Sequence, residues 1–133
     1  MVTLDDLDPP RWPDPPSDAT GLMRRVHAAR RRPLVELTSE DLRVLAAQQV
    51  ALMRVLPLAA HLLIEDPFVS GDFYPGDLLL AAIKAPDHAW DRLSDMTLAS
   101  RLATVLSALP ETALADLPGD GPNLVARFTA VHG

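Results

Sequence analysis

A proline, a glycine and an aspartate precede a run of six apolar residues near the middle of the chain. Proline has a fixed φ and no backbone N–H, so it suits the first turn of a helix, and Pro75 therefore predicts a helix start. Asp77 would then place its carboxylate beside the free N–H groups and the positive end of the helix dipole. The run from Leu78 to Ile83 has no polar face, which indicates burial on most sides. We therefore expect residues 75–84 to form the central helix of the fold.

The composition favours a single all-α domain. Of the 133 residues, 48% are hydrophobic but only 5% are aromatic. Abundant Leu and Ala with few aromatic side chains favours packed helices over a β-sandwich. Prolines separate the apolar stretches, so we expect a bundle of about six short helices around the buried central helix at residues 75–84.

The proline distribution predicts three parts. Residues 1–19 hold five of the 13 prolines, and we expect this N-terminal arm to contain no helix and to be held by Trp12. Residues 20–117 carry amphipathic helical patterns and form the predicted domain. Residues 118–133 begin with two prolines and two glycines around an aspartate, which predicts a flexible C-terminal segment that could hold a short helix.

Two local signals place further helix boundaries. Thr38 and Asp41 have the spacing of a capping box, with Asp in place of the usual Glu, at the start of a predicted helix. Pro57 interrupts the apolar pattern that follows. Because the residue before a proline disfavours the α conformation, we expect a break or kink near residues 50–57 and a new helix over about 57–65.

The charge and the N-terminus limit the classes of partner. The formal net charge is −6, which argues against general affinity for nucleic acid and suits a basic protein partner. The first residues are acidic and proline-rich, unlike a signal peptide. The apolar segment 44–64 contains Arg54 and His61 and does not fit a membrane span. We expect a cytoplasmic protein without membrane contact.

The chain carries no recognisable catalytic or cofactor motif. Motifs for zinc hydrolysis, phosphate binding, a serine nucleophile and dinucleotide binding are all missing, and there is no cysteine. Asp87, His88 and Asp91 would give a histidine flanked by carboxylates, but a helix start explains Asp87 and no third ligand is evident. Asp72 and Asp77 form a second carboxylate pair, in which the helix start already accounts for Asp77. We therefore expect no enzyme activity, metal or cofactor.

Two longer strings of residues resemble a known family. They are Glu36-Leu37-Thr38-Ser39-Glu40-Asp41-Leu42-Arg43, followed by Gln48-Gln49, and Gly71-Asp72-Phe73-Tyr74-Pro75-Gly76-Asp77-Leu78-Leu79, with support from Arg24-Arg25-Val26-His27 and Trp90. Over roughly residues 20–110 the chain resembles the small helical type of bacterial contact-dependent growth inhibition immunity proteins. The resemblance implies a cytoplasmic protein that binds a toxin domain delivered by a neighbouring cell and blocks it stoichiometrically. The implied partner is the cognate toxin C-terminal domain, and many such toxins are nucleases.

The residues that would bind the toxin fall at two predicted helix starts. The candidates are Asp72, Tyr74, Asp77, Asp87, Trp90 and Asp91. Tyr and Trp are typical interface anchors, and we expect the first three candidates to be exposed at the mouth of the central helix. The opposing interpretation is that the Gly71–Leu79 string holds the fold through a tight turn, a capped helix and an aromatic plug. Toxin contacts would then come from surface positions such as Asp87, Asp91 and Asp95.

Two other functions remain open from the sequence. A helical adaptor with a non-toxin partner would have the same features. An RNA-contacting module would use the basic cluster within Arg24–Arg32. A solvated helix face with cations near the helix C-terminus explains that cluster equally, and the acidic total favours this explanation. We therefore expect no direct contact with nucleic acid.

Overall fold

The structure, a computed structural model, describes all residues 1–133 and contains nine α-helices, one short 3₁₀-helix and no β-strand. The all-α prediction is confirmed, with more helices than the expected six. The helices are α1 (Leu4–Leu7), α2 (Gly21–Arg31), the 3₁₀-helix η1 (Leu34–Glu36), α3 (Ser39–Ala47), α4 (Leu52–Glu65), α5 (Asp77–Ile83), α6 (Asp87–Asp91), α7 (Leu98–Ser107), α8 (Glu111–Ala115) and α9 (Gly121–His132).

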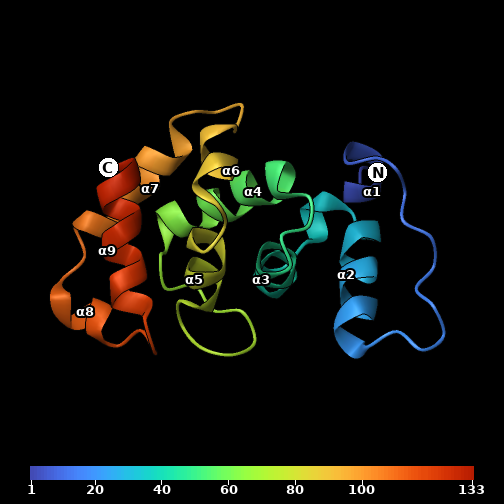
Figure 1. Cartoon of the computed structure of the whole chain (residues 1–133), viewed down its shortest axis with the longest axis horizontal. Coiled ribbons are helices and arrows are strands. Elements are labelled where there is room, and N and C mark those ends of the chain that lie inside the picture. Colours follow the sequence, from blue (N-terminus) through green and yellow to red (C-terminus); the bar gives the residue numbers. More distant parts are fainter.

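The helices follow one another across the molecule, with α5 in the middle. Helices α1 and α2 lie at one end, and α8 and α9 lie at the other (Figure 1). Helix α5 packs against α3, α4 and α9, and all of its residues are buried. A helix without a polar face has to be enclosed by its neighbours. The predicted central helix is therefore confirmed.

Helix α5 begins at Asp77, two residues later than predicted. Gly76 has a φ of 95°, a left-handed conformation that residues with a side chain rarely adopt, so it precedes the helix as its N-cap. The approach of α8 adds a second requirement. A Cβ atom at Gly76 would lie 2.6 Å from Cδ2 of Leu117. Gly76 therefore allows both the sharp turn into α5 and the close approach of Leu117, which follows α8.

Helices α3 and α4 show one prediction confirmed and one that was wrong. Thr38 and Asp41 form the reciprocal capping box at the start of α3. Helix α4 begins at Leu52, however, and continues through Pro57. The break lies at the start of the expected region, where Gln49 and Ala51 have positive φ values of 55° and 51°, so only the helix start expected at Pro57 was wrong. Neighbouring residues on α4 are fully buried in the core, which offsets the hydrogen bond that Pro57 cannot donate.

The N-terminal arm is more structured than expected. Helix α1 forms within it, so the expectation that the arm contains no helix was wrong. Arg30 is fully buried and donates from Nε to Asp5 Oδ1 and from Nη1 to Asp8 Oδ2, each over 2.8 Å. Trp12 packs edge-on against the ring of His27, with 5.0 Å between the centroids. Buried ion pairs and an aromatic contact thus bind the arm to α2.

The C-terminal segment forms α9, which is 12 residues long and exceeds the expected short helix. Helix α9 packs against α5, α7 and α8. Its buried Phe128 packs edge-on against Trp90, with 5.2 Å between the ring centroids. This helix therefore closes the side of the core opposite α3 and is part of the fold.

Candidate functional site

The most distinctive surface feature is the loop of residues 66–76, which connects α4 to α5. Its second half, residues 70–76, is defined here as the motif loop. An isolated bridge pairs Ser70 with Pro75 across its base. The hydroxyl of Ser39, the first residue of α3, donates to the carbonyl of Ser70 over 2.7 Å. The motif loop is thus closed on itself and attached to the start of α3.

Asp77 fixes the conformation of the motif loop from beneath. Its side chain is buried, and its oxygens accept from the amide of Gly71 over 2.5 Å and from the amide of Phe73 over 3.0 Å. The expectation that Asp77 is exposed was therefore wrong. The carboxylate lies at the start of α5, as predicted, but it turns back to bind the residues that precede the helix.

A second buried carboxylate, Glu40 on α3, holds the same loop from the side. It accepts from the amide of Asp72 over 2.9 Å, and from Nε and Nη2 of Arg43 over 2.6 Å each. These two charge-assisted bonds from Arg43 are the main reason that the pKa of Glu40 lies below its ordinary value. Two buried carboxylates and one arginine thus determine the loop conformation.

Gly71 is required where these two carboxylates meet. A Cβ atom there would lie 2.5 Å from Oε1 of Glu40 and 2.9 Å from Oδ2 of Asp77. Such distances are below van der Waals contact, so any side chain would displace one of the carboxylates. Gly71 is therefore needed because the two carboxylates lie too close to its backbone to leave room for a side chain.

The motif loop presents one large aromatic side chain to solvent. Phe73 is 68% exposed, and the guanidinium carbon of Arg43 lies 4.4 Å from the centroid of its ring. Tyr74 is half-buried beside it. A rigidly held exposed aromatic residue loses little entropy on binding, which is typical of interface anchors.

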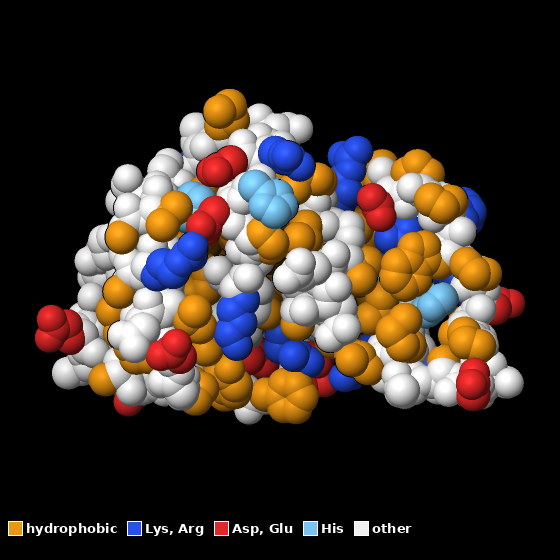
Figure 2. Space-filling view, in the orientation of Figure 1, with side chains coloured by type: hydrophobic (Ala, Val, Ile, Leu, Met, Phe, Trp, Pro, Cys, Tyr) orange, Lys and Arg blue, Asp and Glu red, His pale blue; other side chains and the backbone are white.

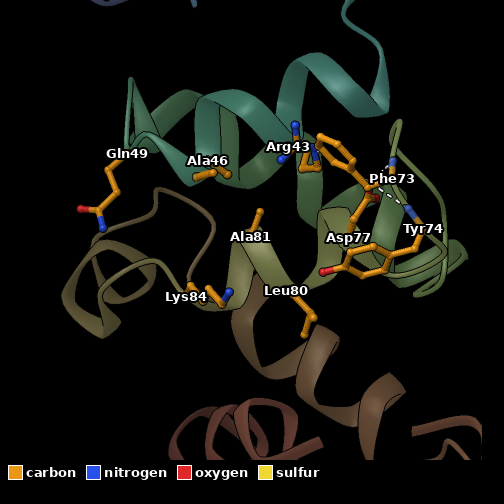
Figure 3. Close-up of a pocket in the computed structure, with 10 residues that line it drawn as sticks. Arg43, Ala46, Gln49, Phe73, Tyr74, Asp77, Leu80, Ala81 and Lys84 are labelled. Atoms are coloured by element: carbon orange, nitrogen blue, oxygen red, sulfur yellow. Dashed lines mark hydrogen bonds and ion pairs between the residues drawn. The ribbon is translucent and has the colours of Figure 1, made fainter. Parts of the chain in front are cut away.

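A groove of about 300 Å³ lies between α3 and α5, and Phe73 and Tyr74 are among the residues that line it. Figure 3 shows Arg43 and Phe73 at one side of it, Tyr74 and Lys84 toward the other, and Ala81 between them. Gln49 lies exposed at its far end. The groove combines small apolar side chains with cationic and hydrogen-bonding groups, which fits binding of a polar side chain from another protein.

Asp72 is the exposed acidic candidate of the motif loop. Its Oδ2 lies 3.2 Å from Nη2 of Arg25, which in turn contacts Glu40 through Nη1 over 3.3 Å. The ion pair links the loop to α2 and partly neutralises the charge of Asp72. The structure therefore brings together three of the sequence candidates, Asp72, Tyr74 and Asp77, with the first two accessible.

The other three candidates lie on α6, away from the motif loop (Figure 1). Trp90 is only 1% exposed and donates from Nε1 to the carbonyl of Ala82 over 3.2 Å, so it packs in the core. Asp87 accepts from Arg127 over 2.6 Å, and this bond is the largest cause of a pKa below the ordinary value. Asp91 is exposed, with Oδ1 3.9 Å from Nδ1 of His132.

Asp95 belongs to the same end of the molecule, in the segment between α6 and α7. It accepts from both the amide and the hydroxyl of Thr97 and lies 3.9 Å from Arg101. Like Asp87, it makes contacts within the protein. Asp91 is therefore the most accessible of the acidic positions on this side.

The basic cluster of α2 is largely neutralised within the protein. Arg25 pairs with Glu40 and Asp72, and the buried Arg30 pairs with Asp5 and Asp8. The remaining pairs join Arg31 to Asp5 and Asp14 and join Arg32 to Asp41, while Arg24 donates to the carbonyl of Ser17 and has no acidic partner. Backbone phosphates attract cations that are free to bind them. This cluster presents little such charge, which weakens the RNA interpretation.

The buried carboxylates near the motif loop are engaged in contacts within the protein. No group of three or more His, Asp or Glu residues has the geometry to hold a metal ion. Glu40 and Asp77 are each bonded to backbone amides and lie near Arg43. The hydrogen bonds that these two carboxylates accept therefore hold the motif loop.

Phe73, Arg43 and Glu40 are the residues of this site that the sequence candidates do not include. The sequence does carry a signal for Phe73, because it is an aromatic residue in a polar turn directly before a buried helix. In the sequence, Glu40 is explained as an acid in the first turn of α3. That explanation gives no sign of its hydrogen bond with Asp72, which lies 32 residues later. Only the packing of α3 against α5 brings these residues together.

Comparison with known proteins identifies the family. Residues 6–99 match the family model described as CDI immunity proteins, where CDI is contact-dependent growth inhibition. The chain belongs to this family. The matched range contains the motif loop, Glu40 and Arg43, and it ends before α8 and α9. No curated protein and no solved structure gives a significant match. In addition, none of the helices is long and apolar enough to cross a membrane.

Proposed function

We propose that this protein is the immunity partner of a contact-dependent growth inhibition toxin and that it neutralises the toxin domain by stoichiometric binding. The family membership implies a toxin-neutralising role. The single structural observation that carries the proposal is Phe73, a 68% exposed aromatic residue on a loop whose amides are held by the buried carboxylates of Glu40 and Asp77. A rigid aromatic projection suits protein binding better than catalysis.

The proposed toxin-facing residues are the exposed ones of the motif loop, Asp72, Phe73 and Tyr74. Asp91 is retained as a secondary contact on α6, and Asp87 as a residue that positions α9 through Arg127. Asp77 and Trp90, both buried, act on binding through the fold and do not touch the partner in this proposal.

The proposed partner is the C-terminal domain of the cognate toxin, with a nuclease as the favoured type. Nucleases that bind phosphate backbones carry basic clefts, and a protein of net charge −6 associates with such surfaces quickly through electrostatic steering. In this proposal the protein acts in the cytoplasm, without a cofactor and without catalysing a reaction.

Co-expression with the toxin domain encoded beside this gene tests the proposal. Cells that carry the toxin domain should grow only when the protein is also expressed, and an inactive toxin variant should co-purify with it at equal stoichiometry. A toxin domain from an unrelated system serves as the specificity control. Continued growth arrest with no complex between the two folded proteins would refute the immunity function and leave a helical adaptor as the interpretation.

A further inference from the structure

A second, more apolar groove lies on the other side of Tyr74. It has a volume of about 520 Å³ and separates the α4–α5 loop from α8. One wall consists of Phe68, Tyr74 and Pro75, and the other consists of Ala113, Leu117 and Pro118. We call it the α8 groove. An apolar side chain of a partner would bury its surface here without displacing any residue of the core.

One acid lines the α8 groove, and four more lie within three residues of a lining residue. Asp116 lines the groove itself, and Glu111 begins α8. Asp120 follows Pro118 by two residues, while Glu65 and Asp66 precede Phe68 and end α4. All five carboxylates are exposed. Two segments far apart in the sequence thus bring five acids to the surroundings of one apolar groove.

These five acids have no cationic partner within the protein. None of the ion pairs in the structure includes them. The acids of the motif loop and of α6 are paired instead, with Arg25, Arg43, Arg127 or His132. Figure 2 shows red side chains at the end of the molecule that carries α8. Apart from Asp18 and Glu36, the acids that form no ion pair all lie in or next to the segments that line this groove.

Only one of the two walls of the groove lies within the residues that match the family model. Phe68, Tyr74 and Pro75 lie within the matched residues 6–99, whereas α8 and the segment after it lie beyond them. One wall thus comes from the part that matches the family model, and the facing wall comes from the residues after the matched range. Such a division suits a surface that binds one particular partner, because specificity requires contacts that differ between related proteins.

We propose that the α8 groove receives an apolar side chain from a basic segment of the toxin domain, and that the α8 wall determines which toxin is bound. The inference rests on the proposed immunity function and extends it by naming the surface and the chemistry of its occupant. The groove supplies apolar area, and the five unpaired acids supply the charge complementary to Lys or Arg residues that flank the inserted side chain.

A matched pair of variants on α8 tests the apolar part. Ala113→Arg places a long cationic side chain in the groove, and Ala115→Arg makes the same change at an exposed position of the same helix outside the groove. Titration calorimetry with the inactive toxin domain should show Kd increased at least about tenfold for Ala113→Arg. The control should remain close to the wild-type Kd. Circular dichroism melts verify that both variants are folded.

A second pair tests the charge. Glu65→Lys with Asp116→Lys reverses two of the groove acids, and Asp18→Lys with Glu36→Lys reverses two exposed, unpaired acids elsewhere. Both double variants change the net charge equally. The groove variant should associate more slowly, and its rate should depend less on salt than that of the control, because rim charges act mainly on association.

The outcomes separate the two proposals. If the wild-type protein binds the toxin and both groove variants bind it like their controls, the groove proposal is overturned while the immunity function stands. If filling the groove changes only the self-association of the free protein, the occupant is a second copy of this chain and the proposal is likewise wrong. If the wild-type protein fails to bind the toxin, both proposals fall together.

Discussion

The guanidinium carbon of Arg43 lies 4.4 Å from the centroid of the Phe73 ring, while the Nε and Nη2 atoms of Arg43 bind Glu40. One arginine therefore supports the exposed aromatic residue and secures the buried carboxylate that holds its loop. A guanidinium can do both because its face stacks on a ring while its edge donates hydrogen bonds. The exposed ring is thus held in place before any partner arrives.

Phe73→Ala should weaken toxin binding without unfolding the protein. The substitution removes a side chain that is 68% exposed, so the free energy of unfolding should change by less than about 1 kcal/mol, the scale of one cation–π contact. The Kd for the toxin domain should rise about tenfold or more if Phe73 is an anchor. Val35→Ala, at a 95% exposed apolar position, is the control. Equal affinities of the two variants would remove Phe73 from the interface.

Gly71→Ala should disturb the motif loop. The new Cβ atom would lie 2.5 Å from Oε1 of Glu40, so this carboxylate must move and its bond from the Asp72 amide weakens. We expect a loss of about 1–3 kcal/mol in the free energy of unfolding, measured in urea. Gly21→Ala, where a Cβ atom meets no neighbour within 4 Å, should leave stability unchanged or slightly higher. Similar stabilities for the two variants would contradict the close packing at Gly71.

Leu79→Ala should test the central position of α5. Leu79 has 0% exposure, and truncating a fully buried leucine costs about 2–5 kcal/mol through lost transfer energy and the remaining cavity. Leu22→Ala, at a 45% exposed position on α2, makes the same chemical change on the surface. Chemical denaturation measures both. A loss at Leu79 below about 0.5 kcal/mol, the range of surface substitutions, would be incompatible with burial of α5.

Stability at acid pH should depend on Glu40. Its pKa is lowered in the folded protein, chiefly by the bonds from Arg43, relative to the ordinary value of 4.5. The folded state thus favours the charged form, so this stabilisation is present above the ordinary pKa and is lost as pH falls through the lowered one. The wild-type protein should exceed Glu40→Gln in unfolding free energy near pH 7, and the difference should shrink as the pH falls below the ordinary value of 4.5. Glu36→Gln, at an exposed and unpaired acid, should show no such convergence.

Local sequence signals determined much of the helical framework. The capping box of α3 joins residues three apart, and the burial of α5 follows from a run without a polar face. Pro33 and Pro110 lie between helices, as a residue that lacks an N–H should. The family resemblance likewise depended on contiguous strings. These features involve neighbours within a turn or two of helix, so they can be recognised without knowledge of the fold.

The tertiary structure alone decided how distant residues meet. Glu40 binds the amide of Asp72 across 32 residues, and Arg30 binds Asp5 across 25, so neither the role of Glu40 nor the attachment of the N-terminal arm to α2 follows from local pattern. Pro57 stays within α4 because core packing outweighs one missing hydrogen bond. Exposure of Phe73, burial of Asp77 and the α8 groove likewise depend on which elements pack together. Charge and polarity can be read from a sequence, but the partner of each charge is fixed only when long-range packing brings the two side chains together.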